Sequence, residues 1–212
     1  MLIRPNAAAR VMGFARYERL ERAAPEDVLA AALHWQEDFL AAQDGIVFHA
    51  FLGNLSGQFA DVILACDEAS FDAMSKNHPT AQSSRDFMAL LDPASIRLRR
   101  NIILKDGIMP PTDFSCVEFG TFRLSESVDA TADDVQRASD RIDATYLKGS
   151  ANTRAHFVSQ IDERTFSETV FGQTMAATRR ICAGYVGEPD CEELLGLFDP
   201  RSVDLDFWFP LA

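Results

Sequence analysis

The sequence predicts an α+β fold made of two tandem copies of one β-α-β-β-α-β unit, and three observations support this. The chain aligns with itself without gaps when Leu90 is set on Leu197. The clearest match in this repeat alignment is LLDPASIRL against LFDPRSVDL. Apolar residues also follow helical and strand periods in the same order in both copies. We therefore expect one copy over residues 11–104, a linker over 105–116 and a second copy over 117–212.

Each copy begins with a short apolar strand and continues into an amphipathic helix. In the first copy, Pro25 suits the first turn of this helix, and Val28 and Trp35 recur on one face at helical spacing. In the second copy, Thr131 and Asp134 have the spacing of a capping box. The predicted strands cover 12–17 and 119–124.

A hairpin, a second helix, a short extra helix and a last strand complete each copy. Turn sequences GNLSGQ and QIDER separate the hairpin strands, and Asp-Pro ends each short helix. This order is that of the ferredoxin-like split unit. The remaining predicted ranges are 46–52, 59–66, 68–76 and 95–102 in the first copy, and 153–159, 166–171, 175–183 and 202–209 in the second.

Composition and charge exclude several classes of protein. The chain has 212 residues, 47% of them apolar, which is typical of a folded globular protein. A net charge of −12 disfavours nucleic acid and anionic membrane surfaces as partners. No apolar run approaches the roughly 20 residues that span a bilayer, and no signal segment is recognisable. The four cysteines form no C-x-x-C pair, so we expect reduced thiols, no metal site and a cytoplasmic protein.

The segment DGIVFHAFLGNLSGQFADVILACDEASFDAMSKNHP, residues 44–79, resembles the strand–hairpin–strand–helix pattern of the dimeric α/β-barrel superfamily. This group includes the antibiotic-biosynthesis-type monooxygenases and their haem-degrading relatives. The resemblance implies that the sheets of the two copies close an intramolecular α/β barrel. It also implies monooxygenase-like activity on an aromatic or polyketide-like substrate, with no cofactor required. His78 resembles the histidine that follows the second helix in the haem-degrading members, so haem is the alternative cofactor.

Alternation along the strands places an Arg–His–carboxylate set on one face of each sheet. In the first copy the set is Arg16, His49 and Asp61, our candidate catalytic residues. We expect it to face away from the helices, because the alternate positions are mostly apolar. A histidine beside a carboxylate is oriented for general-base work, and an arginine binds anionic or carbonyl groups. A structural salt-bridge cluster is the competing interpretation. The second copy repeats the set as candidate ligand-binding residues Arg123, His156 and Glu168.

Three further residues are candidates for ligand binding. Asn77 and His78 lie in a helix-stop sequence, where a turn or the mouth of a pocket are the two interpretations. Trp208 alternates with phenylalanines in the last strand, where it lines the barrel lumen or covers an interface. The expected partner is a small apolar or aromatic ligand. A non-catalytic binding or assembly module with a side-chain-filled barrel is the remaining alternative.

Opposite charges at matching positions favour pairing of the two copies within one chain. Arg97 and Arg99 in the last strand of the first copy align with Asp204 and Asp206 in the second. Two-fold symmetry between identical chains cannot produce such complementarity, whereas a fused pair can. We therefore expect a monomer with an internal pseudo-dimer, or a homodimer of it.

Overall fold

The structure, a computed structural model, describes residues 1–212. Contacts divide the chain into two compact units, Met1–Arg100 with Pro210–Ala212, and Asn101–Phe209. The boundary after Arg100 falls inside the strand formed by residues 97–103, so this strand contributes to both units. Each unit combines one antiparallel sheet with helices, which confirms the α+β class and the two ferredoxin-like repeats. No helix has both the length and the apolar character that crossing a bilayer requires.

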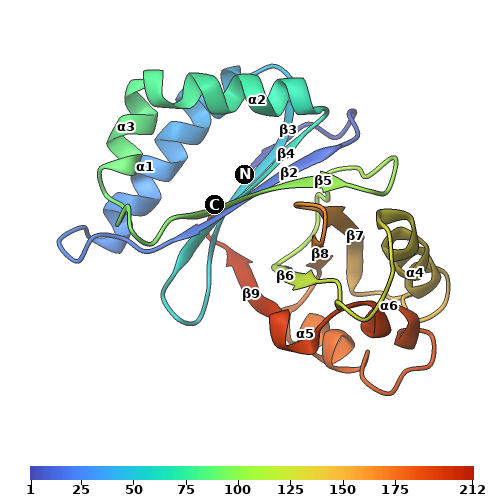
Figure 1. Cartoon of the computed structure of the whole chain (residues 1–212). Helices are drawn as coiled ribbons and strands as arrows, with labels where there is room; N and C mark the ends of the chain where they lie inside the picture. Colours follow the sequence, from blue (N-terminus) through green and yellow to red (C-terminus); the bar gives the residue numbers. More distant parts are fainter. The chain divides into compact units, whose positions relative to one another are not determined.

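In the first unit the strands are hydrogen-bonded in the order β1-β3-β4-β2-β5. The helices α1, α2 and α3 cover one face of this sheet (Figure 1). The bounds are β1 (Leu2–Ile3), β2 (Val11–Tyr17), α1 (Pro25–Asp38), β3 (Ile46–Gly53), β4 (Phe59–Ala65), α2 (Glu68–Asn77), α3 (Gln82–Met88) and β5 (Arg97–Ile103). Only β1 lies outside the elements that the sequence predicted.

In the second unit the order is β7-β8-β6-β9, and the last residues of β5 pair with β7. Helices α4 and α5 pack on this sheet, and α6 packs on α4. The bounds are β6 (Cys116–Arg123), α4 (Ala132–Ala144), β7 (Thr153–Gln160), β8 (Thr165–Gly172), α5 (Met175–Ala183), α6 (Glu192–Leu197) and β9 (Asp204–Pro210).

The internal repeat extends to irregularities of the backbone. In the repeat alignment the first residue of β3 falls on that of β7, and the first residue of β5 on that of β9. The register of β3 shifts between Ile46 and Phe48, and that of β7 shifts between Thr153 and Ala155. A bulge therefore stands at the same place in both hairpins, ahead of the histidine that each strand carries.

Local sequence signals account for the helix starts. Asp67 caps α2 by accepting a hydrogen bond from the Ser70 amide at 2.7 Å. The capping box of Thr131 and Asp134 is present at the start of α4, as predicted. Pro25 occupies the first turn of α1, where its missing N–H is not needed.

The predicted faces of β3 and β4 were wrong, because His49 and Asp61 face the helices, whereas Arg16 of β2 faces away from them, as predicted. Strand β4 pairs Asp61 with Ala15 of β2, so both residues point to the same side of the sheet. That side is the helix side, because His49 contacts Gln36 and Trp35 of α1. A shift of one residue in register moves every side chain of a strand to the other face. Alternation within a single strand shows which residues share a face, but not which face lies under the helices, because the pairing between strands decides that.

Candidate ligand pocket in the first unit

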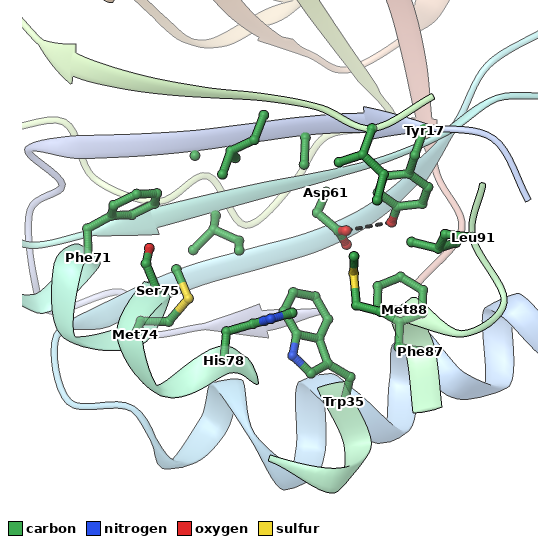
Figure 2. A pocket seen from close by; sticks show the side chains of 15 residues that line it. Tyr17, Trp35, Asp61, Phe71, Met74, Ser75, His78, Phe87, Met88 and Leu91 are labelled. Atoms are coloured by element: carbon green, nitrogen blue, oxygen red, sulfur yellow. Dashed lines mark hydrogen bonds between the residues drawn. The ribbon is translucent and has the colours of Figure 1, made fainter. Parts of the chain in front are cut away.

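An apolar pocket of about 260 Å³ lies between the sheet and the helices of the first unit. Figure 2 shows aromatic and methionine side chains from the helices facing strands β2 and β4 across this space. Its lining residues are Gly13, Ala15, Tyr17, Trp35, Asp61, Ile63, Phe71, Met74, Ser75, His78, Phe87, Met88, Leu91, Ile96 and Leu98. Asp61 contributes the one carboxyl group among them, and no lysine or arginine lines the pocket.

The Asp61 carboxylate is held by two neighbours at the sheet side of the pocket. The Tyr17 hydroxyl donates to Asp61 Oδ2 at 2.5 Å (Figure 2). His49 Nε2 lies 2.8 Å from Asp61 Oδ1. Burial, with the adjacent negative charge of Asp61, raises the pKa of Tyr17 well above its usual value. Tyr17 therefore keeps its proton and remains a donor to the carboxylate.

His49 lies behind Asp61 and does not line the pocket. Its Nδ1 atom is 2.9 Å from Gln36 Oε1, and its ring meets the Trp35 indole edge-to-face at 5.3 Å between centroids. The residue is 1% exposed. His49 thus joins α1 to the sheet and fixes the orientation of the carboxylate that does line the pocket.

His78 approaches the pocket from the end of α2. Pro79 breaks the helical hydrogen-bond pattern after Asn77, and a short 3-10 turn follows. The imidazole packs edge-to-face on Trp35 and Phe39, at 5.4 and 5.7 Å between centroids. Burial lowers the pKa of His78, and the negative charge of Asp61 only partly offsets this. The ring is therefore uncharged at neutral pH and available as a base or hydrogen-bond partner.

Small residues on β2 leave room for the pocket. A Cβ atom at Gly13 would lie 2.7 Å from the Phe71 ring, so the glycine allows that ring to approach the sheet. Ala15 occupies the next position on the same face. Its counterpart in the second unit, Phe122, packs against Phe198 with 4.7 Å between ring centroids. The larger side chain of Phe122 therefore fills space in the second unit that stays open beside Ala15 in the first.

The second unit repeats the histidine and carboxylate in its own buried cluster. His156 Nδ1 lies 2.7 Å from Asp143 Oδ1, and its Nε2 lies 2.8 Å from Glu168 Oε1. Burial alone would lower the pKa of His156, but the hydrogen bonds and charges of the two carboxylates raise it to about 9. The Tyr185 hydroxyl donates to the same Glu168 oxygen at 3.0 Å.

A third buried carboxylate lies beside this cluster. Glu118 of β6 is 4% exposed, and the Cys182 thiol of α5 is its hydrogen-bond partner. Burial and the negative charge of Glu168 raise the pKa of Glu118 to about 7. Burial and the charge of Glu118 also raise the pKa of the Cys182 thiol.

The structure brings only part of each predicted set together. His49 and Asp61 are in contact, as are His156 and Glu168. Arg16 pairs with Ala60 in the register, so it points to the face opposite to Asp61, and the expected trio is corrected to a pair. Arg123 is separated from Glu168 in the same way, because Gly120 is the β6 residue that pairs with Glu168.

The remaining candidates lie outside this pocket. Asn77 is exposed and donates to Gln43 Oε1 at 3.2 Å. Trp208 is buried on β9, opposite Val117.

The sequence reasoning missed four residues of the two clusters, Gln36, Asp143, Tyr17 and Tyr185. The repeat alignment contained a signal for two of them. It sets Gln36 on Asp143, so a polar residue recurs on the otherwise apolar side of the helix. No group of three or more His, Cys, Asp or Glu side chains is arranged to hold a metal ion.

Solved structures resemble this chain along nearly its whole length. A haem-binding protein of Thermus thermophilus has a TM-score of 0.63 and 10% identity, covering 100% of this chain and 96% of that one. An anthrone oxidase-like protein has a TM-score of 0.59 and 11% identity, covering 96% and 92%. A ferredoxin fold protein of Listeria monocytogenes, related to antibiotic biosynthesis monooxygenases, has a TM-score of 0.52 and 9% identity, covering 96% of both.

The chain therefore shares the ferredoxin-like fold of the antibiotic-biosynthesis-type monooxygenases, as the sequence resemblance predicted. No protein-family model and no curated protein matches it by sequence.

Proposed function

We propose that the first unit binds a small aromatic molecule and oxidises it with molecular oxygen, in the manner of a monooxygenase. The observation that carries this proposal is the apolar pocket of about 260 Å³ with two basic groups, Asp61 and His78, in its wall. The similarity to an anthrone oxidase-like protein and to a relative of antibiotic biosynthesis monooxygenases supports the reaction class.

The size and lining of the pocket favour a ligand of about two fused rings. An apolar cavity of about 150 Å³ accommodates benzene, and this pocket encloses about 260 Å³. Trp35, Phe71 and Phe87 form aromatic walls, which favour offset or edge-to-face packing with a second ring system. The naphthalene skeleton is therefore a suitable probe.

The reaction is illustrated by 1-naphthol. Transfer of its hydroxyl proton to a basic group of the pocket leaves a naphtholate, which is electron-rich at the para carbon. That carbon bonds to O2, and loss of water from the resulting hydroperoxide gives 1,4-naphthoquinone. One oxygen atom stays in the product and the other leaves in water, so O2 is the oxidant and no separate reductant is consumed. The protein supplies the base and a dry, oriented site.

Haem fits this pocket poorly. No lysine or arginine lines it to pair with the propionates, and the buried Asp61 would repel them. The neutral imidazole of His78 is the one feature suited to an axial ligand.

The test is oxygen uptake and product analysis with 1-naphthol under labelled O2. We expect consumption of O2 and a quinone that carries one labelled oxygen atom. Ala15→Phe, which introduces the ring found at Phe122 in the second unit, should abolish both binding and turnover. Ala15→Ser is the matched control, because it adds a hydroxyl without filling the pocket, and it should retain both.

Three outcomes would contradict the proposal. Failure of naphthalene and 1-naphthol to bind would show that the pocket does not accept aromatic ligands. Binding without O2 uptake would favour a non-catalytic binding module. A Soret band in the purified protein that disappears in a His78→Gln variant would establish the haem alternative.

A further inference from the structure

The two units hold corresponding clusters that differ at several positions, since Tyr17, Gln36 and His78 of the first unit align with Leu124, Asp143 and Tyr185 of the second. In the repeat alignment, His49 corresponds to His156 and Asp61 to Glu168. Each histidine connects a side chain of the first helix of its unit, through Nδ1, to the strand carboxylate, through Nε2. The shared geometry allows one unit to be read as a template for the other.

In the second unit a tyrosine hydroxyl already donates a hydrogen bond to the carboxylate. The Tyr185 hydroxyl donates to Glu168 Oε1 at 3.0 Å, and Tyr185 is 6% exposed within the apolar core of that unit. The ring also packs edge-to-face on Tyr146, at 5.4 Å between centroids. Burial and the charge of Glu168 raise the pKa of Tyr185, so its hydroxyl keeps the proton that it donates.

In the first unit the residue at the position of Tyr185 is His78, and the space beside it is open. The imidazole of His78 packs on Trp35 and Phe39 and makes no hydrogen bond to Asp61. Asp61 is also one methylene shorter than Glu168, which leaves further room between the carboxylate and α2. The pocket thus opens in the volume that a phenol ring fills in the other unit.

We propose that the ligand of the first unit presents a phenolic hydroxyl to Asp61, as Tyr185 presents its hydroxyl to Glu168. This inference rests on the proposed function and narrows it to neutral hydroxylated aromatics. Tyr17 and His49 each satisfy one oxygen of Asp61, and a carboxylate oxygen accepts more than one hydrogen bond. Asp61 can therefore accept a further hydrogen bond from the ligand hydroxyl.

The electrostatics of the pocket exclude the corresponding acids. Asp61 is negative, His78 is held uncharged by burial, and no lysine or arginine lines the pocket. An aromatic carboxylate would thus lie beside the Asp61 carboxyl group with no lysine or arginine in the lining to pair with it, which is unfavourable in a buried site. A ligand hydroxyl, in contrast, would donate a favourable hydrogen bond to the Asp61 carboxylate.

The experiment measures the affinity of the purified protein for four probes that share one ring system. The probes are naphthalene, 1-methoxynaphthalene, 1-naphthol and 1-naphthoate, titrated by calorimetry. We expect 1-naphthol to bind at least about 10-fold more tightly than 1-methoxynaphthalene, which lacks the donor, as one charge-assisted hydrogen bond allows. We expect no binding of 1-naphthoate.

Variants identify the group that accepts the hydrogen bond from the ligand hydroxyl. Asp61→Asn should reduce the preference for 1-naphthol over 1-methoxynaphthalene, whereas His78→Gln should retain it. His78→Tyr, which copies the second unit, should fill the pocket and weaken 1-naphthol binding at least about 10-fold. Tyr185→Phe and the exposed His34→Tyr are controls that should leave binding unchanged.

The outcomes separate this inference from the proposed function. Equal affinity for the three neutral probes would overturn the phenol assignment and leave the aromatic pocket intact. Loss of the hydroxyl preference in His78→Gln but not in Asp61→Asn would assign the hydroxyl to His78 and also overturn it. Absence of binding by all four probes would contradict the proposed function itself.

Discussion

At the scale of single residues, the main feature is a buried histidine joined to a carboxylate in each unit. Losing one partner of such a pair leaves the other buried and uncompensated, which costs more than an exposed pair contributes. In the first unit Tyr17 donates to Asp61, which also lines a pocket, while in the second Tyr185 donates to Glu168 within a packed core. The same pair therefore serves a potential ligand in one unit and a packed core in the other.

Replacing His49 with alanine tests its structural contribution. We expect His49→Ala to lower the free energy of unfolding by about 3–5 kcal/mol, because Asp61 and Gln36 lose their buried partner. Urea denaturation measures this change. The exposed His34 is the control, and His34→Ala should change stability by less than about 0.5 kcal/mol. Similar small effects of both substitutions would show that the His49 contacts contribute little.

Glu118 predicts a specific pH dependence of stability. Its pKa rises from 4.5 when unfolded to about 7 when folded, so the folded state binds more protons between these values. The free energy of unfolding therefore falls as pH rises from 4.5 to 7, by about 3 kcal/mol from this group. Above pH 7 the loss is complete.

The variant Glu118→Gln removes this contribution. Relative to wild type, it should gain up to about 3 kcal/mol more stability at pH 8 than at pH 5. Urea denaturation at both pH values measures the difference. His156, whose raised pKa makes stability fall between pH 6.5 and 9, is present in both proteins and cancels. A variant-minus-wild-type difference that is the same at both pH values would contradict the assignment.

At the scale of elements, helix α2 connects fold stability to the pocket. Its residues Phe71, Met74 and Ser75 line the cavity, and Asp67 holds its first turn. Hydrogen bonding to Ser70 lowers the pKa of Asp67, which keeps the cap charged. Helix α4 of the second unit has a comparable cap in Thr131 but contributes no residue to this pocket.

The two caps provide a matched pair of substitutions. Asp67→Ala and Thr131→Ala should each lower the free energy of unfolding by about 1 kcal/mol, the usual effect of losing an N-cap. Only Asp67→Ala should also weaken the binding of 1-naphthol, because α2 forms a wall of the pocket. Urea denaturation and calorimetric titration measure the two effects. Equal binding losses would show that general destabilisation, and not the position of α2, controls affinity.

At the scale of the whole molecule, the two units share element order and register irregularities but differ in their interiors. The first has the apolar pocket, and the second has Phe122 and Tyr185 where the first has Ala15 and His78. We therefore expect the chain to bind its ligand in one unit only.

Hydrogen exchange with mass spectrometry tests this asymmetry. Saturating 1-naphthol should slow amide exchange in the peptides that cover 68–88, in the first unit. The corresponding peptides of the second unit, covering 175–195, should exchange at unchanged rates. Slower exchange in both regions would indicate two sites. Slower exchange in 175–195 alone would show that the ligand binds in the second unit, contrary to the prediction.

The elements, their order and the internal repeat were predictable from the sequence. Periodicity and turn residues predicted the strands and helices of both units to within a few residues, since these signals depend on local backbone preferences and on burial of one face. The contact of His49 with Asp61 was also predicted from the sequence, because alternation places both residues on one face of the hairpin and a histidine and a carboxylate recur at these positions in the second copy.

The face that these residues occupy, and the side chains that surround them, depend on contacts between distant segments. The register between β2 and β4 turned Asp61 toward the helices and Arg16 away, and a single-residue shift would have reversed this. The pocket likewise depends on the joint volumes of Ala15, His78 and their neighbours from α1, α2 and α3. Packing among distant segments sets such a volume, and no local pattern in the chain records it.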